Sequence, residues 1–271
     1  MSRRVVRAVL SVFLLSSAVA VSPASAQTVH SLNVGGGWFF PRGIDSRPSD
    51  DVFVRNYFGE PLPVFDFDPS VTDALLFDGM SDFRSGTFFG EWNVSFGSRV
   101  EIGGGVGFYN KTVDTVYRDI VNFAFDPPRE IQQEIGLRIV PWTGVVRFLP
   151  FGRAGDIQPY VGVGIAALNY RYVERGEFVD VETGDIFCAG TPGCPTPEYK
   201  ATGTAIGGVW LVGVKLPIGG DIYGMNVEYR RQYGTGDAGT QKGDAGIDKA
   251  FVAEKIDLGG GSLLFSFTVR F

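Results

Sequence analysis

The chain ends on the sequence SLLFSFTVRF, residues 262–271. Apolar side chains alternate there with small or polar ones: Leu263, Phe265, Phe267, Val269 and Phe271 share one face, and Ser262, Ser266, Thr268 and Arg270 share the other. Only Leu264 breaks the alternation. A repeat of two is the period of a β-strand, whose successive side chains point to opposite faces. The stretch therefore predicts a final strand with one apolar face.

Seven further segments show the same alternation, and no helical periodicity of useful length follows Gln27. The segments are 29–40, 85–96, 99–110, 134–148, 159–170, 200–215 and 221–233, and the eighth strand occupies about 256–271. Within 134–148 the pattern changes phase near Pro141. Because proline inside a strand usually marks a bulge or an edge, we predict a bulge that turns both Arg138 and Arg147 inward.

The connections between these segments alternate in length. The long ones are 41–84, 111–133, 171–199 and 234–255, and the short ones are 97–98, 149–158 and 216–220. Outer-membrane barrels connect their strands in this way, with extended loops outside the cell and tight turns in the periplasm. The alternation therefore predicts four long extracellular loops and three short periplasmic turns.

The N-terminus predicts a secretory signal peptide over residues 1–26. Arg3, Arg4 and Arg7 precede the apolar stretch VLSVFLLSSAVAV, and the small residues 24–26 precede Gln27. The apolar stretch is too short to cross a membrane as a helix. Loss of three arginines and no acids takes the formal charge from −6 to −9. So acidic a chain argues against nucleic acid as a partner.

A sheet in a bilayer must close on itself, because each unpaired N–H or C=O group at its edge costs several kcal/mol in lipid. Eight is an even number, as in single-chain bacterial barrels, and each segment reaches the ~9–11 residues that a tilted strand needs. We therefore predict an all-β fold, an eight-stranded antiparallel transmembrane β-barrel in an up-and-down meander over 27–271. A ten-stranded barrel is the alternative, because apolar stretches within 41–84 can form an extra hairpin.

Aromatic residues gather at the ends of the segments, which predicts two girdles at the two membrane interfaces. The outer girdle takes Trp38, Phe39, Phe40, Phe108, Tyr109, Tyr170, Tyr172, Tyr229 and Tyr233. The inner girdle takes Phe96, Phe148, Tyr160, Tyr223 and Phe271.

The interior of so small a barrel holds side chains rather than a wide channel. The inward positions predict a polar network of Glu91, Glu101, Arg138, Arg147, Lys215, Glu228, Arg230 and Arg270. Buried charges must be paired, so both signs are needed there. The network either plugs the barrel or lines a narrow polar path, for which inward glycines leave room for water. The sequence leaves both interpretations open.

Two cysteines, Cys188 and Cys194, lie within FCAGTPGCP. In an oxidising compartment this close pair predicts a disulfide in the third long loop. No histidine or third cysteine lies nearby, so we predict no metal site there.

The sequence offers little for catalysis. Its single histidine, His30, falls at the periplasmic end of the first strand, which is the wrong side for chemistry on outer-leaflet lipid. No G-x-S-x-G sequence is present, and the glycine-rich stretches GGGVG and VGVGIA do not lead into helices. We predict that the protein is not an enzyme and uses no cofactor.

The stretches QPYVGVGIAALNYRY (158–172), DIYGMNVEYR (221–230) and FSFTVRF (265–271) resemble the broad outer-membrane β-barrel domain family, related in architecture to OmpA-like and OmpW-like small barrels. The resemblance implies a bacterial outer-membrane location, contact with outer-membrane lipid, and Phe271 as the signal that the barrel assembly machinery reads. OmpA-like members that tether peptidoglycan use an added soluble domain, and this chain stops at Phe271.

Three functions follow as hypotheses. The first is a non-enzymatic, monomeric surface barrel that presents its loops in a structural or interaction role. The second is a narrow channel for small or hydrophobic solutes, as the OmpW-like resemblance implies. The third, a lipid-modifying membrane enzyme, is disfavoured by the position of His30.

Overall fold

The computed structural model describes residues 28–43, 46–47, 51–52, 80–122, 127–179, 186–187, 198–218, 222–238, 240–242, 248–250 and 255–271. The predicted signal peptide, most of the first long loop, and both Cys188 and Cys194 lie outside the described residues. The predicted disulfide therefore stays a prediction.

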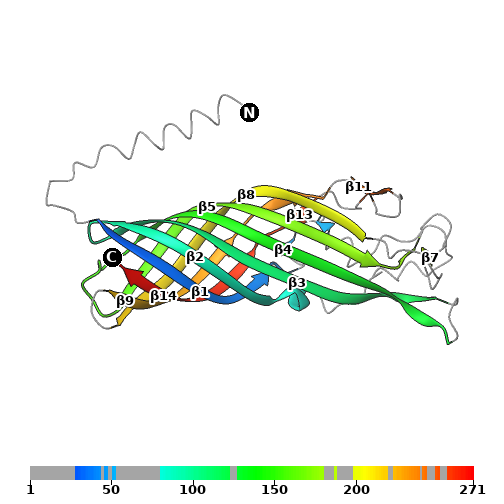
Figure 1. Ribbon diagram of the computed structural model, residues 1–271, viewed down its shortest axis with the longest axis horizontal. Coiled ribbons are helices and arrows are strands. Elements are labelled where there is room, and N and C mark those ends of the chain that lie inside the picture. Colours follow the sequence, from blue (N-terminus) through cyan, green and yellow to red (C-terminus); the bar gives the residue numbers. More distant parts are fainter. Residues whose placement is uncertain are drawn as a thin grey trace, which may run out of the picture.

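Eight antiparallel strands form a closed barrel, and each pairs with the barrel strand before and after it in the chain. The strands are β1 (Val29–Pro41), β2 (Ser85–Phe96), β3 (Val100–Asn122), β4 (Arg129–Phe148), β5 (Gln158–Gly176), β8 (Glu198–Ile218), β9 (Tyr223–Gln232) and β14 (Gly260–Arg270). Figure 1 shows the tilted ring, with the C-terminus at the end opposite the long loops. The predicted eight-stranded meander is confirmed. The ring of described strands has no place for a further hairpin, so the ten-stranded alternative is wrong.

The seam between the first and last strands closes the ring. β1 and β14 pair in antiparallel register from Ser31 opposite Arg270 to Pro41 opposite Gly260. Beyond the ladder, the backbones of His30 and Phe271 exchange hydrogen bonds of 3.0 and 2.9 Å. The closing strand read from the sequence therefore has its partner along its whole length, and neither strand presents an open edge to lipid.

Smaller elements lie at the long-loop end of the barrel. They are the 3-10 helix η2 (Met80–Phe83) and the short strands β6 (Phe178–Val179), β7 (Ile186–Phe187), β10 (Thr235–Asp237), β11 (Thr240–Lys242), β12 (Asp248–Ala250) and β13 (Lys255–Asp257). The short strands pair as β6–β7, β10–β13 and β11–β12. Within the described part of the chain, no helix is long and apolar enough to cross a membrane.

Four neighbouring strands, β3, β4, β5 and β8, are much longer than the others and project beyond the ring (Figure 1). The sequence pattern placed 111–133 and 171–199 in loops, whereas strand structure continues to Asn122, resumes at Arg129 and runs on to Gly176. Ten residues of β4, Arg129 to Arg138, rise about 25 Å at the usual strand tilt. We call this four-stranded projection the extension.

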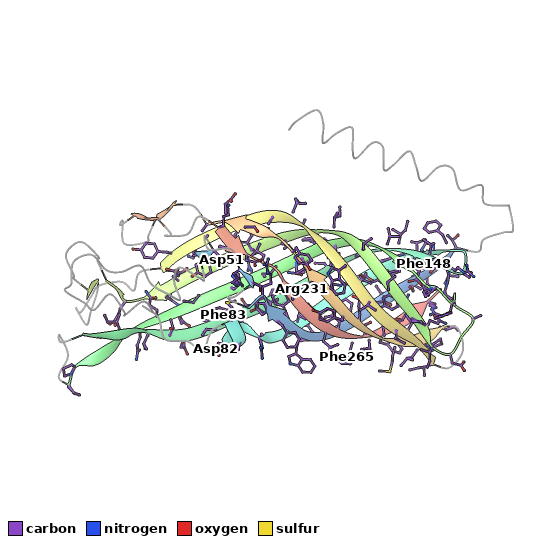
Figure 2. All side chains as sticks on the ribbon, turned by 180° about the vertical axis from the view of Figure 1, so that it is seen from behind. Asp51, Asp82, Phe83, Phe148, Arg231 and Phe265 are labelled. Atoms are coloured by element: carbon purple, nitrogen blue, oxygen red, sulfur yellow. The ribbon has the colours of Figure 1, made fainter. Side chains whose placement is uncertain are left out.

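The outer wall of the ring is apolar. Its exposed side chains include Leu32, Val34, Trp38, Phe88, Trp92, Ile102, Phe108, Trp142, Val146, Val163, Ile165, Ile206, Trp210, Met225, Phe265 and Phe267. Figure 2 shows Phe265 projecting from the barrel wall, and Phe148 near the end opposite the extension. Large apolar side chains exposed on every barrel strand form a belt that matches lipid rather than water.

The two faces exchange character along the long strands. On β4, Trp142 and Val140 point outward within the belt, but Arg138 and Glu134 occupy the same outward face in the extension. The inward residues Ile135, Leu137 and Ile139 are buried. The extension therefore has an apolar inner face and a polar outer face, as a sheet in water does.

This exchange corrects the prediction of a bulge at Pro141. The pairing of β4 with β5 runs without a shift from Gln133 to Phe148, with Pro141 opposite Leu168. Arg147 points inward and Arg138 outward, although both lie on one unbroken strand. The sequence changes phase there because the surroundings change from lipid to water, while the backbone continues unaltered.

The predicted girdles are also only partly present. Nine of the fourteen predicted girdle residues are exposed on the outer wall as predicted: Trp38, Phe40, Phe96, Phe108, Phe148, Tyr223, Tyr229, Tyr233 and Phe271. Five other predicted girdle residues are buried inside: Phe39, Tyr109, Tyr160, Tyr170 and Tyr172. Most of these five belong to the apolar core of the extension.

Two glycines allow β1 and β14 to approach closely. A Cβ atom at Gly35 would lie 2.0 Å from the carbonyl oxygen of Phe265, and one at Gly37 would lie 1.9 Å from that of Leu263. By contrast, a Cβ at Gly90 on β2 would meet no atom within 4 Å. A side chain is therefore excluded at Gly35 and Gly37 but not at Gly90.

We expect Gly35→Ala to destabilise the barrel by about 1–3 kcal/mol, because the added methyl group forces the seam strands apart. Urea unfolding in detergent micelles and the heat-modifiable mobility of the folded band measure this loss. Gly90→Ala is the matched control and should remain near the wild type. Equal stability of the two variants would show that the seam is not closely packed at Gly35.

Candidate functional site: the barrel interior

The lower interior of the ring is polar because alternate positions on the strands supply inward charges. Glu91 on β2, Arg147 on β4, and Glu228 and Arg230 on β9 all point into the barrel and are buried. Each is flanked in sequence by residues of the lipid-facing wall. The period of two that builds the apolar belt therefore also assembles the interior cluster.

Arg147 is the centre of this cluster. Its Nη2 lies 2.6 Å from Oε1 of Glu91 and 3.0 Å from Oε2 of Glu228, and its Nη1 donates to Oδ1 of Asn93 at 2.6 Å. The guanidinium also lies over the ring of Tyr160, 5.5 Å from its centroid. One arginine thus joins β2, β4, β5 and β9 across the barrel.

Arg230 forms the second bridge between the same two acids. Its Nη2 lies 2.9 Å from Oε2 of Glu91 and 2.7 Å from Oε1 of Glu228, to which its Nε also donates at 2.8 Å. The hydroxyl of Tyr160 donates to the other oxygen of Glu228 at 2.9 Å. Two arginines and two glutamates therefore form a closed, charge-balanced quartet.

A second pair lies nearer the short-turn end. Lys215 on β8 donates to Glu101 on β3, and the hydroxyl of Ser95 donates to the other oxygen of Glu101 at 3.3 Å. The ammonium of Lys215 lies 5.5 Å from the centroid of the Tyr160 ring, on which Arg147 also packs. With this pair the interior carries three cations and three anions, which is the balance that burial requires.

Neutral side chains complete the lower interior. Asn226 donates to Thr268 at 2.9 Å, and Thr268 donates to Asn33 at 2.7 Å, across β9, β14 and β1. At the mouth near the short turns, Arg270 donates to the amide oxygen of Gln158 at 3.1 Å. Of these bonds, the one between Thr268 and Asn33 crosses the closing seam, and the other two join β14 to β9 and to β5.

Inward glycines make room for these side chains. A Cβ at Gly103 would lie 2.2 Å from Oδ1 of Asn93 and 2.9 Å from Nη1 of Arg147, and one at Gly213 would lie 2.5 Å from the hydroxyl of Tyr160. In the interpretation of a narrow polar path, the inward glycines were expected to leave room for water. At these two positions the structure fills it with the ion-pair cluster.

Above the quartet the interior becomes apolar. A cavity of about 30 Å³ lies at the boundary, lined by Phe39, Tyr109, Ile139, Arg230 and neighbouring residues. Such a volume holds one or two water molecules. Beyond it, the buried core of the extension begins, where Tyr109 donates to the backbone oxygen of Phe83.

Pieces of the first and last long loops cover this core, and Figure 2 shows Asp51 and Phe83 at the level where the extension leaves the ring. Arg47 lies 2.6 Å from Asp51 and donates to the backbone oxygen of Asp257 at 3.2 Å. The backbone N–H of Asp257 donates to Asp51. Burial raises the pKa of the Asp51 carboxyl, against the opposing effect of Arg47. The loops are thus held by buried polar contacts.

The structure places the eight predicted interior residues as follows. Glu91, Arg147, Glu228 and Arg230 form the quartet, Glu101 and Lys215 form the second pair, and Arg270 lies half-buried at the mouth. Arg138 is the exception, because it lies on the outer face of the extension. The predicted network did not include Asn33, Asn93 and Asn226, although the same period of two places them at inward positions of their strands.

A closed ring of eight antiparallel strands, with an apolar belt outside and paired charges within, defines the class: the chain is an outer-membrane β-barrel protein. The belt and the closed ring fit the barrel to a bilayer, as in barrels that span bacterial outer membranes. No protein-family model matches the sequence, and no curated protein matches it.

Solved structures of similar fold exist. Ail, the attachment invasion locus protein of Yersinia pestis, solved in complex with the heparin analogue sucrose octasulfate, is 8% identical at a TM-score of 0.39, over 90% of this chain and 99% of that one. Neisserial surface protein A is 10% identical at a TM-score of 0.38, over 90% of this chain and 96% of that one. The N-terminal β-barrel domain of Pseudomonas aeruginosa OprF is 10% identical at a TM-score of 0.35, over 91% of this chain and 98% of that one.

We expect Arg147→Met to lower the free energy of unfolding by about 3–5 kcal/mol, because it leaves Glu91 and Glu228 buried with one cation fewer. Urea unfolding in micelles measures this loss of unfolding free energy. The double variant Arg147→Met with Glu91→Gln restores the charge balance and should recover part of the loss.

Arg99→Met, in the exposed turn between β2 and β3, is the control and should change stability by less than about 0.5 kcal/mol. Wild-type stability of Arg147→Met would mean that the quartet does not hold the barrel together.

Proposed function

We propose that the protein is a non-enzymatic surface barrel: side chains plug its interior, and the extension holds its long loops above the membrane for a structural or interaction role. The observation that carries this proposal is the charge-balanced interior. Six ionised side chains pair across the lower ring, and the cavity above them holds only one or two waters.

The shape of the long strands supports the surface role. About 25 Å of β4 lies beyond the last lipid-facing residues, on the side of the long loops. The inner face of the extension is packed with buried apolar side chains, so it is a rigid support rather than a collection of free loops. Such a support carries the loops clear of the lipid headgroups.

The surroundings of His30 argue against catalysis. Its Nδ1 accepts a hydrogen bond of 3.3 Å from the indole N–H of Trp92, and its ring stacks on Phe271 with centroids 6.2 Å apart. Trp92 also meets Phe271 edge to face, at 5.6 Å. His30 therefore serves as part of an aromatic cluster at the short-turn rim, beside the end of the seam.

Planar-bilayer recording tests the plug. Purified wild-type protein should give no reproducible single-channel steps. The charge-neutral double variant Glu101→Ser with Lys215→Ser empties space near the short-turn mouth and should raise the frequency of small conductance events while the heat-modifiable band persists. Regular steps from the wild type would overturn the plug and favour the narrow channel for small solutes.

Thiol labelling on intact cells tests the surface role. In a background with Cys188 and Cys194 replaced by serine, Gln132→Cys, exposed on the outer face of the extension and six residues beyond Arg138, should react with a membrane-impermeant maleimide. Arg99→Cys, in the turn at the opposite end, should react only after the outer membrane is permeabilised. The reverse pattern would place the extension in the periplasm and contradict the proposal.

A further inference from the structure

Side chains on the outer faces of the four long strands form rows that run around the barrel wall. The pairings place Val106, Trp142, Ala167 and Ile206 in one row within the apolar belt. Four residues nearer the long-loop end on each strand, the pairings place Asn110, Arg138, Arg171 and Thr202 in another row. We call this second row the donor row, because every member carries a hydrogen-bond donor.

The height of the donor row matches the lipid headgroups. Between the two rows lies a mixed one, in which Val140 pairs with Asn169 and Asn169 with Thr204. The donor row stands about 5 Å above this mixed row, allowing for strand tilt. The headgroup layer is about 5–8 Å thick on each side of the hydrocarbon. The side chains of the donor row therefore project outward into that layer.

Two arginines of the donor row face one another. Arg138 on β4 pairs directly with Arg171 on β5, and like charges directly opposite in a sheet are destabilising. Nε of Arg138 is buried and has no hydrogen-bond partner within the described part of the chain. This arrangement is unfavourable in isolation and becomes favourable when an anion binds between the guanidinium groups.

Only one acid lies within ion-pair distance of these cations among the described contacts. Glu198 lies 3.5 Å from Arg171 and 3.8 Å from Arg175, and it also pairs with Lys200. The hydrogen bond from Lys200 lowers the pKa of Glu198, with further lowering by Arg175 and Arg171. Glu198 is thus ionised at neutral pH, but it is shared among three cations and leaves Arg138 unpaired.

A groove beside the donor row offers space for a ligand. Its volume is about 260 Å³, and it is lined by Arg138, Arg171 and Arg175, with Glu134 and Glu198. Gly136 forms part of the lining, and a Cβ there would meet nothing closer than 3.7 Å. The groove therefore has open space at Gly136, and its walls carry three arginines and two glutamates.

We propose that this groove binds a phosphate group on the headgroup of an outer-leaflet lipid, with Arg138 and Arg171 as the two principal donors. Arginine suits this role because its planar fork donates two parallel hydrogen bonds to phosphate oxygens. The lipid, rather than a free anion, is the source because the donor row lies on the outer wall directly above the belt. A lipid held there would immobilise headgroups around the base of the extension.

Native mass spectrometry of the micelle-solubilised protein tests the proposal, with diphosphoryl lipid A as the probe. Arg138→Gln and Arg171→Gln should each weaken binding by at least about fivefold. Gly136→Val fills the groove without changing its charge and should weaken lipid A binding to a similar extent. Glu198→Gln removes the competing carboxylate and should strengthen lipid A binding.

Arg99→Gln removes the same charge at the opposite end of the barrel and should bind like the wild type. Lipid A from which both phosphates have been removed should lose the dependence on Arg138 and Arg171. The heat-modifiable band shows that each variant is folded. Two results would overturn the proposal: unchanged affinity in folded Arg138→Gln with Arg171→Gln, or equal occupancy of the groove by millimolar inorganic phosphate, which would make it a site for free anions.

Discussion

The pairing of β1 with β14 is the constraint on which the rest of the structure depends. Lipid offers no hydrogen bonds to a backbone, so a sheet survives there only when its first and last strands satisfy one another. The ladder from Ser31–Arg270 to Pro41–Gly260 does this, and close packing at Gly35 and Gly37 brings the two backbones together. Closure then leaves each strand with one face toward lipid and one toward a narrow interior.

The interior and the extension are two consequences of closure. Inside the ring, every cation of the quartet and of the Lys215–Glu101 pair lies against an anion from another strand, so the charges fix the strands relative to one another. Beyond the membrane, the same strands pass into water and exchange their faces, so that Ile135 and Leu137 are buried while Arg138 faces outward. This exchange of faces leaves the donor row, with its facing arginines, on the outer wall above the apolar belt.

The sequence was sufficient for the ring and insufficient for the extension, for one physical reason. A period of two identifies a strand and its two faces, but it does not state which medium each face meets. The assumption that every apolar face meets lipid predicted all eight strands correctly. It also correctly predicted that Arg147 points inward. The same assumption then required a bulge at Pro141, counted Arg138 as interior, and assigned Tyr170 and Tyr172 to a girdle. These errors disappear once the strands are known to be longer than the membrane, which only the pairing above Asn110 and Arg138 reveals.

Solution NMR of the protein in micelles tests the closed seam most directly. Backbone cross-strand NOEs should connect Leu32 with Val269 and Asn33 with Thr268, and the intervening amides should exchange slowly with solvent. Absence of these NOEs, with rapid exchange along 29–40, or NOEs from 262–271 to a strand other than β1 and β9, would contradict a barrel closed by its first and last strands.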